Sequence, residues 1–310
     1  MIEDKYVDLY AANSKVPVGI ARQEIILTYA LALMEESGLL PRLAFKGGTC
    51  LRKVIFGKQY RFSEDLDFTI LDGGKPQALL QEIQKVFSSP FHDISFHEVE
   101  GSARITTGGI GVQFEYQAAS ASGAFDLEIS FRAQPLLPVL QKPLQVQSYF
   151  KQLEVSAPKI YTLAFEEIVS EKMRATFQRM RPRDVYDLYF CFQKPMNMPQ
   201  LKGLVLIKCW QVRDPFDIDQ FIGNLYSTKY NWEELDNLLA KGSRPGPEKM
   251  VKSIESKAGM FQSLSEEEKE IIADSKRHKS VKLIESTITK LRAIGNQRDA
   301  MKQTTAVYNL

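Results

Sequence analysis

The chain has 310 residues, 44% of them hydrophobic, and its 40 basic and 38 acidic residues leave a formal net charge of +2. This near-neutral balance excludes a basic surface spread over the whole chain, so any contact with nucleic acid must come from local patches. Three distant cysteines without C-x-x-C spacing and three scattered histidines form no array of zinc ligands.

The amino-terminal residues MIEDKYVDLY are acidic and do not have the pattern of a signal peptide. No stretch reaches the roughly 18 consecutive apolar residues expected of a membrane span. We therefore expect a reduced, cytoplasmic protein without a membrane partner.

The first half of the chain predicts alternating helices and strands. Hydrophobic periodicity and turn residues predict a helix over 18–40, a strand from 42 into a glycine turn at 47–48, a short helix over 49–57, a strand over 65–71, a helix over 76–89 and three strands within 94–134.

The second half predicts helices. A long helix is expected over 162–180, ended by the sequence RPR, and a further helix begins near Asp184. The clearest later break is KGSRPGPEK, residues 241–249. We therefore predict an α+β protein with two domains, residues 1–155 and 156–310, the second all-helical and with a break at 241–249.

The sequence RFSEDLDFTI, residues 61–70, places two acids on one face of an expected strand. Asp65 and Asp67 project together because strand side chains alternate, while Leu66 and Phe68 point the other way. Like charges repel, and a bound cation would relieve that repulsion. Mg²⁺ is typically held by one or two carboxylates, substrate phosphates and water.

A glycine turn precedes this strand. Gly47 and Gly48 lead from a strand into a helix, and backbone N–H groups in such a turn form a cradle for an anion. Thr49 could cap the helix or contact phosphate. A third carboxylate from the sequence DLEIS, Glu128 or alternatively Asp126, would complete a two-metal arrangement; whether one or two metals bind stays open.

Each motif also has a plain structural interpretation. A Gly-Gly pair is most often a turn, an Asp-x-Asp strand is most often a solvated face, and a single acid on a strand is usually a surface residue. The order and tight spacing of the glycine turn, the short helix and the paired acids favour the functional interpretation.

The sequence FKGGTCLRKVIFGKQYRFSEDLDF resembles the opening motif of the AbiEii/AbiGii-type nucleotidyltransferase toxins, which are relatives of the MenT toxins. The sequence EEIVSEKMRATFQRMRPRDVYDLYF resembles the later lysine and Arg-Asp-x-x-Asp-Leu motifs of that family. The resemblance covers roughly residues 20–195. It implies a polymerase-β-like nucleotidyltransferase core with a mixed sheet, a helical region after it, and the role of a toxin in a toxin–antitoxin or phage-defence pair.

The resemblance also implies roles for individual residues. The expected catalytic residues are Asp65, Asp67, Lys172 and Asp187, with Asp184 as the alternative last aspartate. The expected metal ligands for Mg²⁺ or Mn²⁺ are Asp65, Asp67 and Glu128, with Asp126 as the alternative to Glu128. The expected nucleotide-binding residues are Gly47, Gly48, Thr49, Arg52, Arg61 and Ser63.

The second motif has a physical interpretation of its own. Lys172 lies at the edge of an apolar helical stripe, where it could reach a triphosphate or simply extend to solvent. Asp184 lies near a helix start, where the helix dipole favours an acid whatever its role. Asp187 has a weaker structural reason to be there, and we rank it slightly above Asp184.

The leading hypothesis is a metal-dependent enzyme that transfers a nucleoside monophosphate from an NTP to an acceptor and releases pyrophosphate. By resemblance, the acceptor is RNA, such as a tRNA 3′ end, and an antitoxin is the cellular partner. Two alternatives are a noncatalytic nucleotide or RNA binder and a small-molecule nucleotidyltransferase of the antibiotic-modifying type. The absence of a G-x-x-x-x-G-K-[S/T] sequence disfavours a P-loop ATPase.

Overall fold

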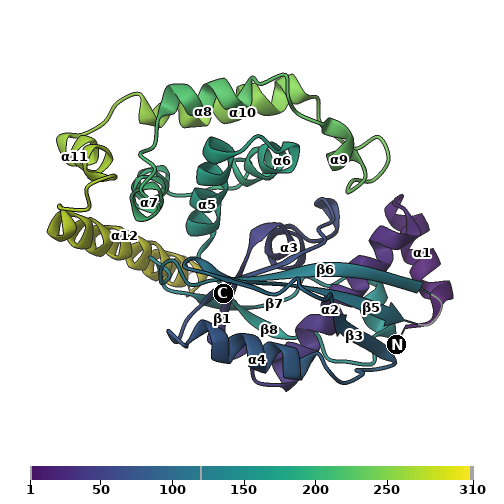
Figure 1. Ribbon diagram of the computed structural model, residues 1–310. Coiled ribbons are helices and arrows are strands. Elements are labelled where there is room, and N and C mark those ends of the chain that lie inside the picture. Colours follow the sequence, from purple (N-terminus) through teal and green to yellow (C-terminus); the bar gives the residue numbers. More distant parts are fainter. Residues whose placement is uncertain (1, 119–120, 308–310) are drawn as a thin grey trace. The chain divides into compact units, whose positions relative to one another are not determined.

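The computed structural model describes residues 2–118 and 121–307, with side chains up to residue 294. The chain divides into two compact units (Figure 1). Unit 1 comprises Met1–Gln134, Val139–Leu163 and Glu233–Arg244, and unit 2 comprises Pro135–Pro138, Ala164–Trp232 and Pro245–Leu310.

Unit 1 is built on one mixed sheet. Its strand order is β3-β5-β6-β2-β1-β8-β7, with β4 paired to β5; β2–β6 and β1–β8 are parallel pairs. The strands are β1 (Leu43–Lys46), β2 (Leu66–Ile70), β3 (Ile94–Glu98), β4 (Arg104–Thr106), β5 (Gly109–Ala118), β6 (Ala121–Ser130), β7 (Leu140–Pro143) and β8 (Lys159–Thr162).

The sheet has one apolar face, as the alternation of residues predicts. Phe68 of β2 lies opposite Phe45 of β1 and Ile129 of β6, and all three are fully buried. Phe87, just after helix α4 (Pro76–Val86), stacks on Phe114 of β5 with ring centroids 4.5 Å apart. Figure 1 shows α4 beneath the sheet. The acidic side chains of β2 and β6 therefore project from the opposite face.

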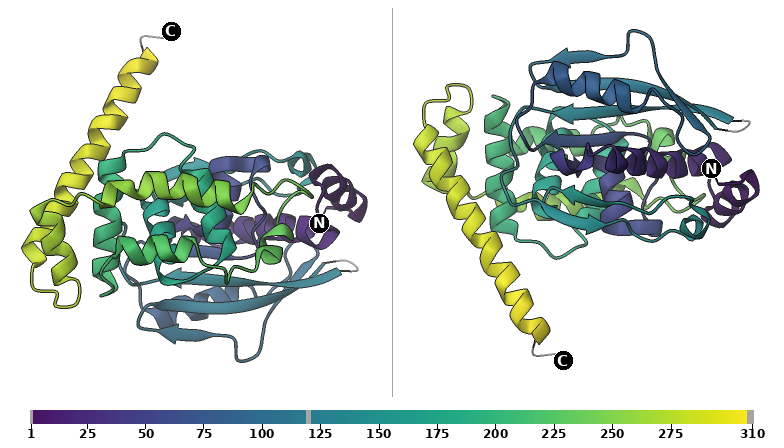
Figure 2. Two further views of the ribbon diagram at one scale, coloured as in Figure 1. Left: turned by 90° about the horizontal axis from the view of Figure 1, so that it is seen from above. Right: turned by 90° about the horizontal axis from the view of Figure 1, so that it is seen from below.

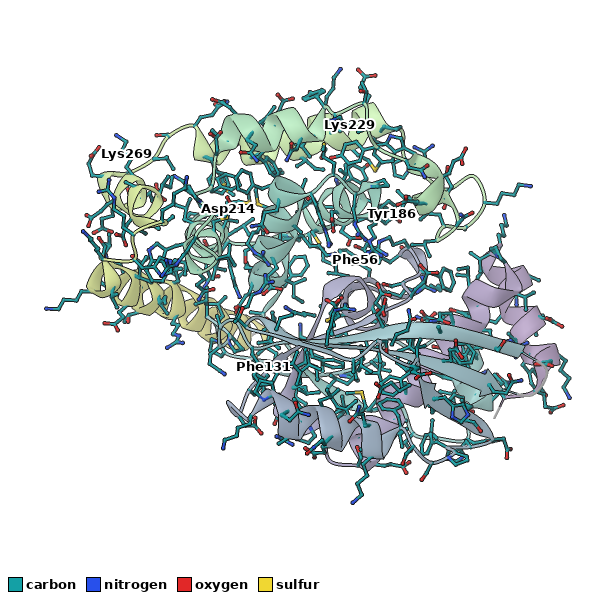
Figure 3. The ribbon with its side chains drawn as sticks, viewed as in Figure 1. Phe56, Phe131, Tyr186, Asp214, Lys229 and Lys269 are labelled. Atoms are coloured by element: carbon teal, nitrogen blue, oxygen red, sulfur yellow. The ribbon has the colours of Figure 1, made fainter. Side chains whose placement is uncertain are left out.

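Other helices of unit 1 come before and after the glycine turn along the chain. Helix α1 (Asp4–Ser14) and helix α2 (Val18–Glu36) precede β1. Helix α3 (Gly47–Cys50) follows β1 and continues without a break as a π-helix, Leu51–Phe56. Figure 3 labels Phe56 at the end of this run. π-Helical turns are rare and often occur at functional sites.

Unit 2 is helical. Figure 2 shows its helices in two further views, including α12, the longest helix described. Its helices are α5 (Phe165–Gln178), α6 (Pro182–Cys191), α7 (Met198–Gln211), α8 (Ile218–Leu225), α10 (Pro247–Ala258), α11 (Glu266–Asp274) and α12 (Val281–Val307); the short α9 (Trp232–Asp236) begins at the boundary with unit 1.

The α+β class, the mixed sheet and the helical C-terminal region are confirmed. The compact units have other bounds than the predicted domains 1–155 and 156–310. Unit 1 extends to Leu163 and also includes the later segment Glu233–Arg244. The backbone N–H of Phe62 donates to the carbonyl of Leu238, which ties this late segment beside the acidic motif. The predicted break at 241–249 contains the later boundary, between Arg244 and Pro245.

No single helix in the described residues is long and apolar enough to cross a membrane. Within the same residues, α1 and α2 taken together have the length and composition of a membrane span, but the chain bends by 114° between them.

Candidate active site

The glycine turn and the acidic strand of unit 1 lie against each other. Gly47 has a φ of +76°, a conformation that favours glycine, and a Cβ built on it would overlap the Asp67 carboxylate. The paired strands β1 and β2 bring them together, because Lys46 and Asp67 are direct partners in the antiparallel register. Gly47 is therefore required both for the turn and for the close approach of Asp67.

Gly48 makes room for two other residues of the same motif. A Cβ at Gly48 would overlap the Arg61 guanidinium and lie 3.0 Å from Ser63 Oγ. Arg61 is fully buried and donates to the carbonyl of Phe62. Arg61 and Ser63 thus pack against the glycine turn from within unit 1.

Thr49 also joins the turn to the acidic strand. Its side chain is fully buried, and its hydroxyl donates to the backbone carbonyl of Asp65. The N-cap position of α3 is Lys46, and no side chain caps it. The expected cap by Thr49 is therefore not formed, and Thr49 instead fixes the spacing between Gly48 and Asp65.

A row of charged side chains crosses the open face of the sheet. In register, Lys46 of β1 lies opposite Asp67 of β2, and Asp67 lies beside Glu128 of β6. Glu128 is exposed, and one of its carboxylate oxygens lies 2.9 Å from an Nη of Arg104 on β4. Asp126, two residues earlier on β6, accepts a bond from the side chain of Gln113 at 3.3 Å.

These carboxylates supply hard oxygen donors, which suit Mg²⁺ or Mn²⁺. Among the described residues, however, no three Asp, Glu, His or Cys side chains converge closely enough to hold a metal ion. Mg²⁺ commonly takes only one or two protein carboxylates and fills its other positions with phosphates and water. The pair Asp65 and Asp67 fits that mode, whereas Glu128 is engaged with Arg104.

Arg52, which is expected to bind nucleotide, lies inside unit 1, and only 1% of it is exposed. Its guanidinium donates to the carbonyls of Gly57 and Tyr60, and its Nε lies 3.6 Å from a carboxylate oxygen of Glu24 on α2. Lys53 lies 3.2 Å from the same oxygen. The helical run after the turn carries Arg52 inward, where its donors meet carbonyls instead of a ligand.

The second motif forms a compact ionic cluster within unit 2. Lys172 Nζ on α5 lies 2.7 Å from Asp187 and 3.4 Å from Asp184, both on α6. Arg179 donates two bonds to Asp184, at 2.8 and 3.2 Å. Figure 3 labels Tyr186, which lies between the two aspartates in sequence. Spacing of three places both aspartates on one face of α6.

Both aspartates are fully buried, so their charges depend on these cations. Burial alone would raise the pKa of Asp184, but Lys172 and Arg179 outweigh it, and the pKa lies below its ordinary value. Burial and the negative charge of Asp184 raise the pKa of Tyr230 to about 12. The cluster thus keeps Asp184 ionised at neutral pH.

The predicted site residues fall into two groups, one in each unit. Unit 1 brings together Gly47, Gly48, Arg61, Ser63 and the acidic strand, and unit 2 brings together Lys172 and the two aspartates. From the sequence, Arg179 is one of four arginines after Lys172 expected to suit polyanion binding, and its two bonds to Asp184 were not foreseen. Arg104 was not assigned to the site, because its place depends on the register of β4, which no motif reveals.

Comparisons with known proteins identify the family and the fold. The family model described as "Nucleotidyl transferase AbiEii toxin, Type IV TA system" matches residues 30–222. The solved structure of MenT4, a nucleotidyltransferase toxin from Mycobacterium tuberculosis H37Rv, is similar with a TM-score of 0.80 and 20% identity, covering 94% of this chain and 100% of that one. At this identity the likeness shows the fold.

A weaker likeness is found to JHP933 from Helicobacter pylori, with a TM-score of 0.48 and 17% identity over 86% of this chain and 99% of that one. A crystal structure of a candidate nucleotidyltransferase, also from H. pylori, gives a TM-score of 0.49 and 19% identity over 79% and 96%. No curated protein matches the sequence. The family model covers more than half of the chain, and the chain belongs to the AbiEii family of nucleotidyltransferase toxins of type IV toxin–antitoxin systems.

Proposed function

We propose that this nucleotidyltransferase transfers a nucleoside monophosphate from an NTP to an RNA acceptor, such as a tRNA 3′ end, and releases pyrophosphate. The reaction depends on Mg²⁺ or Mn²⁺ and takes place in the cytoplasm, where NTPs and RNA are present. The observation that best supports the proposal is the approach of the Asp67 carboxylate to Gly47, since it brings the glycine turn and the acidic strand together.

In this proposal the backbone N–H groups of the turn at Gly47 and Gly48 hold the phosphates of the NTP. Asp65 and Asp67 hold the cation, and Glu128, or alternatively Asp126, is the candidate for a third carboxylate. The bound cation would activate the acceptor hydroxyl and stabilise the leaving pyrophosphate. Thr49, Arg61 and Ser63 keep the turn and the acids in register, because all three are buried against them.

Lys172 neutralises phosphate charge as it develops in the transition state. Asp187, 2.7 Å away, holds the ammonium group of Lys172, and Asp184 anchors Arg179 at the same cluster. The role of Arg52 in nucleotide binding stays a prediction, and its two terminal nitrogens donate to Gly57, Tyr60 and Tyr10 within unit 1. The family implies an antitoxin as the partner in the cell; we propose that the pair acts in phage defence.

The proposal is tested by incubating the protein with each of four radiolabelled NTPs and total RNA. Asp67→Asn keeps the size of the side chain and removes its charge, so transfer should fall by at least about 100-fold. Asp8→Asn on the exposed side of α1 is the matched control and should keep full activity. Transfer that is unimpaired in Asp67→Asn would refute the assignment of the acidic strand.

The same assay separates the alternative functions. A noncatalytic binder would bind NTP without Mg²⁺ in calorimetry and give no labelled product with any acceptor. A small-molecule nucleotidyltransferase would label aminoglycosides and leave RNA unlabelled. Comparing Glu128→Gln with Asp126→Asn identifies the third carboxylate, because the variant that loses more transfer marks it.

A further inference from the structure

Arg104 lies at the end of the charged row on the open face of the sheet. It is the direct partner of Gly111 in the register of β4 and β5, and Gly111 is in turn the partner of Glu128 on β6. Glu128 lies beside Asp67. Strand pairing thus places an arginine on the face that carries the acids, three strands from Asp67.

The sequence makes room for the guanidinium of Arg104. A Cβ on Gly111 would lie 2.8 Å from Nε, 2.9 Å from Cζ and 3.0 Å from an Nη of Arg104. In this position the guanidinium lies close to the backbone of Gly111, where a larger residue would push it aside. This position aims an Nη at Glu128, at 2.9 Å.

The ion pair between Arg104 and Glu128 is weak enough to be exchanged. Both side chains are more than half exposed, at 57% and 55%, so water screens their attraction. A phosphate diester presents two oxygens in the geometry of a guanidinium fork, and arginine binds such groups with two parallel bonds. A phosphate can therefore replace Glu128 as the partner of Arg104.

This face carries more acids than bases along the row. Asp67, Asp126 and Glu128 share it with Lys46, since residues two apart on a strand and direct partners on paired strands project the same way. Lys46 lies directly opposite Asp67, at the other end of the row from Arg104. An RNA strand whose 3′ end is to reach the acidic motif gains from a cation that holds a backbone phosphate at the far end of the row, and Arg104 supplies a cation there within the strand register.

We propose that Arg104 binds a backbone phosphate of the RNA acceptor and positions its 3′ end toward the acidic strand. The inference deepens the proposed function, because it assumes that the acceptor is RNA. Glu128 holds the guanidinium over Gly111 before the acceptor binds. Arg104 is a binding residue for the acceptor and has no contact with the NTP.

The test measures equilibrium binding of total tRNA to the Asp67→Asn protein at several salt concentrations, so that no transfer is needed. Adding Arg104→Gln should weaken binding about fivefold at low salt and reduce the slope of log affinity against log salt by about one. Affinity for NTP, measured by calorimetry on the wild-type background, should not change. The matched control is Arg42→Gln, which removes another part-exposed, ion-paired arginine, just before β1 and at the opposite end of that strand from Lys46.

A second variant keeps the charge and moves it. Gly111→Ala should displace the guanidinium and weaken tRNA binding about as much as Arg104→Gln, and it should have no further effect when Arg104 is already replaced. Equal tRNA affinity and equal salt slope in wild type and Arg104→Gln would overturn the inference, even if transfer to RNA is observed. Labelling of aminoglycosides instead of RNA would overturn the proposed acceptor and leave a measured phosphate contact standing.

Discussion

Each unit contains a buried cluster in which carboxylates meet two cations, and the two clusters differ in access to solvent. In unit 1, Glu24 lies between Arg52 and Lys53, whose side chains are 1% and 2% exposed. In unit 2, Asp184 and Asp187 meet Lys172 and Arg179, whose side chains are 11% and 46% exposed. The first cluster is closed to solvent, whereas Arg179 of the second is about half exposed.

The two clusters also differ in the hydrogen bonds that their carboxylates accept. Neither carboxylate oxygen of Glu24 has a hydrogen-bond partner within the described residues, although two cations surround it. Asp184 accepts bonds from both Arg179 and Lys172. Glu24 therefore balances charge in the interior, where it holds α2 against the helix that follows the glycine turn. Burial of a charged residue by itself does not mark a catalytic group.

The largest expected effect tests the closed cluster. Glu24→Gln leaves Arg52 and Lys53 buried without a countercharge, which should cost about 3–5 kcal/mol of folding free energy. Urea unfolding followed by circular dichroism measures this loss. Glu35→Gln on the exposed side of the same helix is the control. Equal unfolding midpoints for the two variants would contradict the role given to Glu24.

The second prediction tests the open cluster. Lys172→Met should lower transfer by about 100-fold or more, because the charge that meets the phosphates is lost. Lys208→Met is a matched control, since Lys208 is a lysine of the same unit, 8% exposed and ion-paired to Glu167 at 2.7 Å. Both variants should lose stability, but only Lys172→Met should lose activity per folded molecule. Equal specific activities would place Lys172 among the structural lysines.

The smallest effect concerns Arg179. Arg179→Gln removes the two bonds to Asp184 and should cost about 1 kcal/mol at pH 7, because half of the guanidinium is already in water. The pKa of Asp184 is held below its ordinary value, so its stabilising contribution is complete above that value and is lost as the pH falls through the folded pKa.

The stability difference between wild type and Arg179→Gln should therefore be constant above about pH 5 and shrink at lower pH. Urea unfolding at pH 3 to 7 measures it. Arg174→Gln on the same helix, whose guanidinium donates to the uncharged Gln178, should show no such dependence. A difference that grows as the pH falls would contradict the assigned sign.

Much of the fold was readable from sequence because its signals are local. The alternation in β2 and β6 fixed which side chains face the core, and the glycine turn marked the end of β1. Helix α1 was missed because its acidic sequence carries only a weak apolar stripe, with Val7, Tyr10 and Ala11 as its buried residues. Strands β7 and β8 were missed, whereas β1, which is equally short, was predicted because the glycine turn marks its end.

The site was predictable where a motif sets the chemistry and not where packing does. The strand register brings Asp67 beside Gly47, and the roles of both residues in binding metal and phosphate stay predictions. Arg52 looked like a phosphate ligand because it is basic and follows the turn, and its inward direction depends on Glu24, 28 residues earlier. No local sequence pattern predicts an ion pair with a buried carboxylate that lies far away along the chain.

The return of Glu233–Arg244 to unit 1 has a consequence for how the molecule is made. A ribosome releases every predicted catalytic residue well before it reaches Glu233, yet the carbonyl of Leu238, on which the amide of Phe62 depends, arrives only afterwards. A nascent or prematurely terminated chain thus carries the full set of reactive groups without the last brace beside its acidic strand. This region of unit 1 is therefore complete only once synthesis has passed Leu238, even though every predicted catalytic residue lies earlier in the chain.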